Sequence, residues 1–212
     1  MGHRVGKALG EHGLEVITCL RGRSDRTRTL AQRAGIRDVT SLRDLVTEAD
    51  IVLSILVPAE AIGVAESVAG ALGATGVDTP FADCNAISPQ SAGVMDDIIG
   101  QAGGRFIDGS IIGGPPRNGS SPRFYASGPN AAEFEGLREF GLDVRNLGPE
   151  IGKASGIKMC YAAMTKGTSA LYTELLVAAQ AMGLLEPLKA EFQDGQAAVL
   201  QRMESSLAGV PA

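Results

Sequence analysis

The sequence predicts an α/β fold with a doubly wound, mainly parallel sheet, followed by a long helix and part of an all-α domain. Short apolar runs alternate with helical patterns up to about residue 150, as in a parallel sheet with connecting helices. A proline-free stretch then follows at 152–182 and is apolar around most of its circumference. We therefore expect two domains, residues 1–150 and residues 151–212.

The strands and helices of the first domain are expected to alternate. Near-continuous apolar strands are typical of a parallel sheet that helices cover on both faces. The apolar runs predict strands at 14–20, 50–56, 80–85 and 104–110. The segments around them predict helices at 28–35, 41–49, 59–73 and 88–103. Residues 122–148 predict strand, helix and strand, and residues 187–209 predict a last helix with a break near Gly195.

Polar and glycine residues mark the expected ends of these helices. Ser41 and Ser88 stand where an N-cap hydroxyl would accept a hydrogen bond from the first turn. Gly35, Gly73 and Gly103 stand where a helix would stop.

The chain opens with an expected helix, residues 1–11, in which Gly2, Gly6 and Gly10 share one face. A helical glycine costs about 1 kcal/mol relative to alanine, so we expect this face to approach a backbone or a ligand closely. In a dinucleotide-binding βαβ unit the last glycine of G-x-G-x-x-G lies inside the first helix. Gly2 fits that position, which would place a first strand and two more glycines upstream of Met1. The alternative is a helix that simply packs tightly on a sheet.

Net charge and the numbers of cysteine and histidine limit which partners and sites can be expected. The net charge of −5 gives no support for a nucleic-acid or anionic-membrane partner. Three separated cysteines and two histidines do not predict a metal site, and no apolar run approaches the ~20 residues of a membrane span. Each cysteine lies in an apolar stretch, so we expect buried free thiols and a reducing cytoplasm.

The loop after the second expected strand carries Arg21, Arg23 and Ser24. An NAD site usually has an acidic residue here for the ribose 2′-hydroxyl, whereas arginine suits a 2′-phosphate. We therefore expect NADP in preference to NAD, the alternative being a solvated basic loop.

Two further loops follow the carboxyl ends of expected strands, where ligands bind in parallel sheets. The first carries Leu56, Val57 and Pro58, and the second carries Asn85. We expect these residues to contact the cofactor.

The stretch "IIGGPPRNG" contains Gly113, Gly114 and Arg117. The glycines would let the backbone approach a substrate, and the arginine would bind an anion. The alternative is a Gly/Pro-rich turn before the next strand.

Lys158 lies in the long apolar helix, and Tyr161 follows it by one turn on the same face. Burial lowers the pKa of a lysine amine toward a range useful in acid–base catalysis. The alternative is a lysine that extends its amine to the surface.

Taken in chain order, the segments described above resemble those of the β-hydroxyacid dehydrogenase superfamily. This superfamily includes 6-phosphogluconate dehydrogenase, 3-hydroxyisobutyrate dehydrogenase and, more distantly, imine reductases. The resemblance is carried by "ADIVLSILVP", "DCNAISP", "DGSIIGG" and "GKASGIK", and it covers nearly the whole chain. It implies a Rossmann-like domain, a glycine-rich substrate loop and an interdomain helix, with Lys158 as the catalytic lysine.

Three positions depart from the family pattern. Ile112 falls at the substrate-loop serine, Ala162 at the substrate-binding asparagine, and Tyr161 at the histidine of 6-phosphogluconate dehydrogenase. These changes argue against 6-phosphogluconate and against a standard short hydroxyacid as substrate. Tyr161 would exchange a proton with the substrate or merely pack.

The resemblance implies an NADP-dependent oxidoreductase that transfers hydride between the nicotinamide and a small hydroxyl/carbonyl substrate. It also implies a homodimer, formed through the apolar helix at 152–182. The alternatives are a dinucleotide-binding protein without catalysis and an imine reductase-like enzyme.

Overall fold

The computed structural model describes residues 1–117 and 121–207 of the chain. It divides after Met159 into two compact units, and this division falls inside the long helix. The elements run in the order α1 (Gly2–Glu11), β1 (Ile17–Cys19), α2 (Asp25–Arg33), β2 (Arg37–Val39), α3 (Leu42–Glu48), β3 (Val52–Ser54), η1 (Pro58–Glu60), α4 (Ala61–Thr75), β4 (Pro80–Asp83), α5 (Pro89–Gln101), β5 (Arg105–Ile112), β6 (Arg123–Ser127), α6 (Ala131–Glu135), η2 (Gly136–Phe140), β7 (Asp143–Asn146), α7 (Lys153–Ala181) and α8 (Leu185–Leu207).

The elements expected from the sequence are present, and one strand was not expected. β2 pairs in parallel with β1, with Ile17 opposite Arg37 and Cys19 opposite Val39. Arg37 and Asp38 are exposed, and only Val39 of this strand is buried. A three-residue edge strand with one buried side chain has no apolar run that a sequence pattern would reveal.

The strands form two sheets rather than one. The larger sheet has the order β3-β4-β5-β6-β7, and its neighbours are parallel except for the antiparallel pair β5–β6. β1 and β2 form a separate parallel pair. In a doubly wound dinucleotide-binding sheet, one strand would stand between β1 and β3. The break between the sheets therefore falls at the position of the first strand that the glycine pattern of residues 1–11 predicts.

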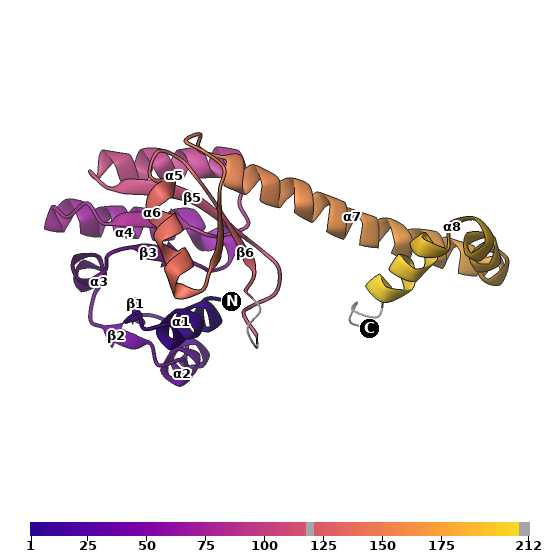
Figure 1. The fold of residues 1–212 in the computed structure, drawn as a ribbon, viewed down its shortest axis with the longest axis horizontal. Coiled ribbons are helices and arrows are strands. Elements are labelled where there is room, and N and C mark those ends of the chain that lie inside the picture. Colours follow the sequence, from indigo (N-terminus) through magenta and orange to yellow (C-terminus); the bar gives the residue numbers. More distant parts are fainter. Residues whose placement is uncertain (118–120, 208–212) are drawn as a thin grey trace. The chain divides into compact units, whose positions relative to one another are not determined.

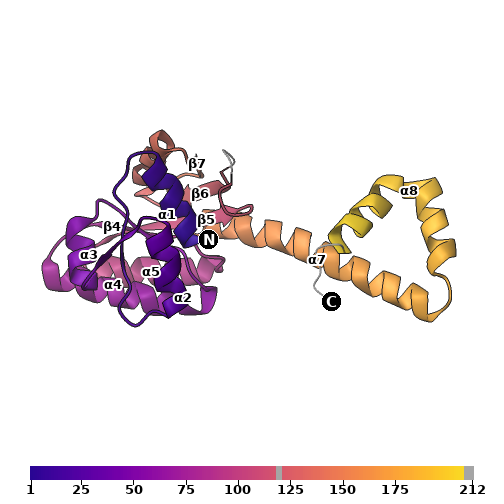
Figure 2. The same cartoon turned by 90° about the horizontal axis from the view of Figure 1, so that it is seen from below.

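Helices cover both faces of the larger sheet. One core cluster joins α3, α4 and α5 to β3, β4 and β5, and Phe81, Leu72 and Met95 are among its fully buried members. A second cluster joins α1, α6 and η2 to the other face, through Val5, Phe124 and Phe134. The two views in Figures 1 and 2 show α4 and α5 side by side.

The expected helix caps are confirmed, with one exception. The hydroxyl of Ser41 accepts from Asp44 N at 3.2 Å, and that of Ser88 accepts from Ser91 N at 3.1 Å. Gly35 and Gly103 follow α2 and α5 in the left-handed region. The stop expected at Gly73 is wrong: α4 continues to Thr75 and ends at Gly76, whose φ of 73° is the left-handed cap.

The glycine face of α1 is close-packed over part of its length. A Cβ on Gly2 would lie 3.4 Å from the Ile55 carbonyl oxygen, and one on Gly6 would lie 2.7 Å from Ile36 Cδ1. A Cβ on Gly10 would have no neighbour within 4 Å, so the expectation of close approach is wrong there. The glycines at the start of α1 thus allow it to lie against both β3 and the β1–β2 pair.

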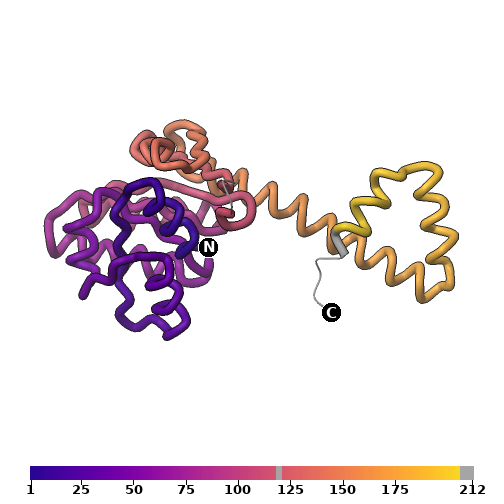
Figure 3. The backbone as a smooth tube through the Cα atoms, turned by 60° about the horizontal axis from the view of Figure 1, so that its bottom comes forward, coloured from indigo at the N-terminus to yellow at the C-terminus, as the bar shows by residue number. Residues whose placement is uncertain are grey.

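The second unit contains most of α7 and all of α8. The break expected near Gly195 is present, because Gln196 has φ −148° and ψ 49° inside α8. The bend is visible in the yellow part of the trace in Figure 3. A small pocket of about 260 Å³ lies between α7 and α8, lined by Leu176, Leu185 and Leu200 among others.

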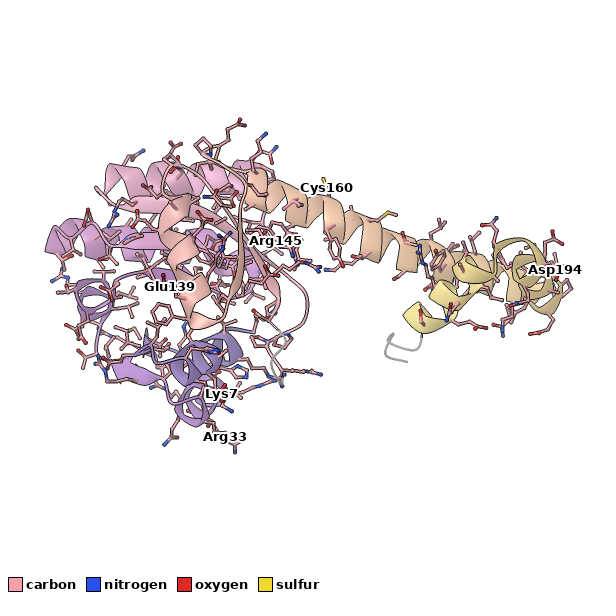
Figure 4. The ribbon with its side chains drawn as sticks, in the orientation of Figure 1. Lys7, Arg33, Glu139, Arg145, Cys160 and Asp194 are labelled. Atoms are coloured by element: carbon pink, nitrogen blue, oxygen red, sulfur yellow. The ribbon has the colours of Figure 1, made fainter. Side chains whose placement is uncertain are left out.

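The cysteines differ in burial, and the expectation that all three are buried is wrong. Cys84 is buried, Cys19 is half-buried and Cys160 is exposed on α7 (Figure 4). All three are free thiols. In the described part of the chain, no helix is long and apolar enough to cross a membrane, and no group of three or more His, Cys, Asp or Glu side chains is arranged to hold a metal ion.

Candidate active site

The first part of the candidate site is a cavity between the two sheets. Its volume is about 1200 Å³, and among the predicted cofactor residues Gly2, Arg23, Leu56 and Val57 line it. Apolar residues of β1, β3 and α1 form much of the remaining wall. The structure therefore brings these four predicted residues to one cavity, whereas Arg21, Ser24, Pro58 and Asn85 are not among its lining residues.

The start of α1 lies at this cavity and offers a helix N-terminus. Met1 is its N-cap, and no side chain forms a capping hydrogen bond there. The amides of a first helical turn, with the helix dipole, favour a phosphate group. The absence of a side chain on Gly2 keeps this turn against the end of β3.

The loop after β1 carries exposed cationic groups. Arg21 and Arg23 are both exposed. Ser24 has a structural role, because its hydroxyl caps α2 by accepting from Thr27 N at 3.4 Å. No acidic side chain follows β1 directly, although Asp38 of β2 accepts a hydrogen bond from Leu20 N at 2.8 Å.

Asn85 has its amide group fully engaged by the protein. Its Nδ2 donates to Ser54 Oγ at 3.0 Å and to Asp83 Oδ1 at 2.6 Å, and its Oδ1 accepts from Leu56 N at 2.6 Å. The side chain is 4% exposed. These bonds join the ends of β3 and β4 and fix the loop that begins at Leu56.

Asp83, which accepts a hydrogen bond from Asn85, is a buried carboxyl group. Burial raises its pKa, the hydrogen bonds from Asn85 and Ser54 oppose this rise, and the nearby charge of Asp108 adds to it. Burial also raises the pKa of the neighbouring Cys84 thiol well above its ordinary value. The interior end of β4 is therefore poor in solvent and unfavourable to added negative charge.

The second part of the candidate site is formed by the ends of β5 and the start of α7. Lys158 is half-buried, and its Nζ donates to the Ile111 carbonyl oxygen at 2.8 Å. The amine is thus held at the end of β5, next to the glycine-rich loop. Tyr161 lies one turn further along α7, in the second unit, and is 47% exposed.

The glycine-rich loop requires glycine at one of its two positions. Gly113 has a φ of 123°, which other residues rarely adopt, and a Cβ there would lie 3.4 Å from Pro122 Cβ. A Cβ on Gly114 would have no neighbour within 4 Å, and Arg117 is exposed. Residues 118–120 lie outside the described residues.

Ile112, one of the departures from the family pattern, is 2% exposed and packs with Tyr125 and Ala154. Its side chain therefore belongs to the interface between β5, β6 and the start of α7. This packing explains why an apolar residue is accommodated at that position.

The polar residues that hold α7 on the sheet were not predicted from the sequence. Asp108, Ser110, Ser127 and Ser155 are all buried, and each forms a hydrogen bond across the β5–β6–α7 junction. The one feature of the sequence that could have indicated them was Asp108, a charged residue inside a strand that leads into the glycine-rich loop. No sequence spacing connects it to Ser155, which lies 47 residues further on.

Comparison with known proteins identifies the family. Residues 1–140 match the model of the NAD binding domain of 6-phosphogluconate dehydrogenase. The chain belongs to this family. It is therefore a member of the β-hydroxyacid dehydrogenase superfamily, as its motifs indicate.

Individual relatives agree with this assignment. An uncharacterised 28.5 kDa protein of Methanothermus fervidus is 31% identical over 175 residues, which cover 82% of this chain and 66% of that protein. The match thus spans slightly less than two thirds of that curated relative. The conserved protein MTH1747, of unknown function and similar in structure to 3-hydroxyacid dehydrogenases, is 33% identical with a TM-score of 0.76, over 96% of this chain and 78% of its own.

A more distant structure shares the fold alone. The imine reductase of Myxococcus stipitatus, solved with NADP+, is 21% identical with a TM-score of 0.70, over 98% of this chain and 73% of its own. The family match identifies residues 1–140 as an NAD-binding domain of this family, and the imine reductase adds only a likeness in fold.

Proposed function

We propose that this protein is an NADP-dependent oxidoreductase that transfers hydride between the nicotinamide and a small molecule with a hydroxyl or carbonyl group. The observation that carries the proposal is the place of Lys158, whose amine is held 2.8 Å from the Ile111 carbonyl oxygen at the end of β5. Its position in "GKASGIK" resembles that of the family's catalytic lysine. A half-buried amine in that place is suited to exchange a proton with a substrate oxygen.

Two elements at the cavity carry groups that suit a dinucleotide. The first turn of α1, which contains Gly2, lines the cavity and would offer its backbone amides to a pyrophosphate. Arg21 and Arg23 are exposed in the loop after β1, and Arg23 lines the cavity. We expect their guanidinium groups to bind a 2′-phosphate, which would favour NADP over NAD. When bound, the nicotinamide would supply the redox chemistry by accepting or giving hydride.

The protein's own residues would have three roles in this reaction. Lys158 would take the proton from the substrate hydroxyl during oxidation or return it during reduction. Tyr161, one turn away, would assist this transfer. Gly113, Gly114 and Arg117 would hold the substrate through the backbone and an anion-binding guanidinium group.

We further propose that the protein forms a homodimer through the helix at 152–182. In the second unit, α7 carries Met164, Leu171, Leu175 and Val177 at 71%, 56%, 43% and 59% exposure. Apolar side chains exposed in such number on one helix are typical of an interface. Sedimentation at micromolar concentration is expected to show a dimer, and a monomer would contradict this proposal.

The function can be tested first by cofactor binding and turnover. The chain is titrated with NADPH and NADH while nicotinamide fluorescence is followed, and is then assayed with hydroxyacids, oxoacids and cyclic imines. We expect saturable NADPH binding and turnover of a hydroxyl or carbonyl compound. Binding without turnover of any compound would favour a non-catalytic protein, and turnover of imines alone would favour an imine reductase; either outcome would overturn the proposal.

A further inference from the structure

Asp108 in β5 is a buried carboxylate whose partners lie in β6, just before α7 and in the first turn of α7. The residue is 1% exposed. Its Oδ2 accepts from Gly152 N at 2.9 Å and from Ser155 N at 3.1 Å, and its Oδ1 accepts from Ser155 Oγ at 2.5 Å. Asp108 therefore caps the first turn of α7 from the sheet, where the amides of a helix N-terminus favour a negative charge.

Two serines strengthen the same junction. Ser127 Oγ in β6 donates to Asp108 Oδ2 at 2.9 Å and accepts from Ala154 N at 3.0 Å. Ser110 Oγ in β5 donates to the Ala154 carbonyl oxygen at 2.7 Å. The first turn of α7 is thus fixed by three buried side chains, and its orientation is set by the sheet.

Lys158 is tied to the same strand one helical turn later. Ser155 and Lys158 are three residues apart on α7, and their partners Asp108 and Ile111 are three residues apart on β5. A shift at the first contact must therefore move the second, because both lie between the same strand and the same helix. A misplacement of about 1 Å at a catalytic group can lower a rate by about 100-fold.

We propose that Asp108 is a positioning residue for Lys158: it fixes the first turn of α7 on β5 and thereby sets the place of the lysine amine. The proposal rests on the role of Lys158 in the proposed function. Asp108 itself would not contact the substrate, because its carboxylate is enclosed by Ser127, Gly152 and Ser155.

The test compares Asp108→Asn and Ser155→Ala with Ser41→Ala, which removes a comparable cap from α3. Asparagine keeps the shape of the side chain but replaces one acceptor oxygen by an NH2 group. We expect kcat to fall about 100-fold in Asp108→Asn and less in Ser155→Ala, with KM for NADPH unchanged and the pH profile of kcat displaced. Ser41→Ala should leave kcat and its pH profile unchanged.

Two further readouts separate this proposal from the proposed function. Amide hydrogen exchange at the start of α7 is expected to speed up in Asp108→Asn and to remain as in the wild type in Ser41→Ala. In a Lys158→Met background, Asp108→Asn should lower kcat no further, because the group it positions is gone. Unchanged exchange, or a full additional loss of kcat in the double variant, would overturn the positioning role. Wild-type turnover in Lys158→Met would instead overturn the proposed function.

Discussion

The two halves of the candidate site differ in how they are held. Around Lys158, buried hydrogen bonds that involve Asp108, Ser110 and Ser127 join the ends of β5 and β6 to the start of α7. Around the cavity, β1 pairs with β2 and β3 pairs with β4, and α1 and α3 pack against both pairs. Polar contacts thus fix the lysine half, whereas apolar packing joins the two sheets that border the cavity. The hydrogen bonds of Asn85 on the cofactor side lie within the larger sheet.

This difference predicts different consequences of mutation. A buried polar network has few arrangements that satisfy every donor and acceptor, so one change displaces several groups. An apolar packing contact tolerates volume-conserving change more readily. Substitutions in the lysine half should therefore affect stability and catalysis more sharply than substitutions at the edge of the cavity.

The largest effect on stability is expected from Gly109→Ala, inside β5. An added Cβ would lie 2.7 Å from the Asp83 carbonyl oxygen and 3.0 Å from Cys84 Sγ, so the strands would have to move apart. We expect the free energy of unfolding to fall by about 2–3 kcal/mol, measured by urea denaturation.

Gly10→Ala is the matched control for this change, because an added Cβ there has no neighbour within 4 Å. It should raise the free energy of unfolding by about 0.5–1 kcal/mol through better helix propensity. Equal stability of the two variants would contradict the view that β4 and β5 are close-packed at Gly109.

A smaller effect, on binding alone, is expected from the double variant Arg21→Ser/Arg23→Ser. If the two guanidinium groups bind a 2′-phosphate, the Kd for NADPH should rise about 10–100-fold and the Kd for NADH should change little. Fluorescence titration measures both. Arg33→Ser, on the exposed end of α2, is the control (Figure 4). An equal loss of affinity for both cofactors would argue against NADP preference.

The smallest expected effect is on the pH dependence of stability. The carboxyl groups of Asp83 and Asp44 should contribute to it with opposite signs. Burial raises the folded-state pKa of Asp83 above its ordinary value of 3.8. The folded state therefore binds more protons in this window, and stability falls as pH rises through it. Hydrogen bonds from Thr40 and Ser41 lower the pKa of Asp44, so its contribution is lost as pH falls through the lowered value.

Urea denaturation from pH 3 to pH 7 tests these signs. In Asp83→Asn, the loss of stability as pH rises above about 4 should be smaller than in the wild type. In Asp44→Asn, the loss of stability at the acidic end should be smaller instead. Slopes unchanged in both variants would contradict the assigned causes of the shifts.

The sequence predicted the parts of this molecule that depend on local pattern. The alternation of strands and helices, the long helix that carries Lys158 and the break near Gly195 are all periodic or compositional signals, and the structure contains them. The short β2 lacked such a signal because only Val39 is buried.

The parts that it could not predict depend on contacts between distant residues. The hydrogen bonds of Asp108 reach residues 44 and 47 positions further on, and no local pattern encodes them. Asn85 was predicted to contact the cofactor from its place after a strand. Its bonds to Ser54, Leu56 and Asp83 instead show it fixing the adjoining loop.

The central claim is that Lys158 transfers the proton while other residues bind the cofactor. It is tested most directly by single-turnover hydride transfer in Lys158→Met, with Lys166→Met as the control on an exposed position of the same helix. We predict a rate about 10²–10⁴-fold lower in Lys158→Met, with an unchanged Kd for NADPH and wild-type behaviour in Lys166→Met. A wild-type rate of hydride transfer in Lys158→Met would contradict the account.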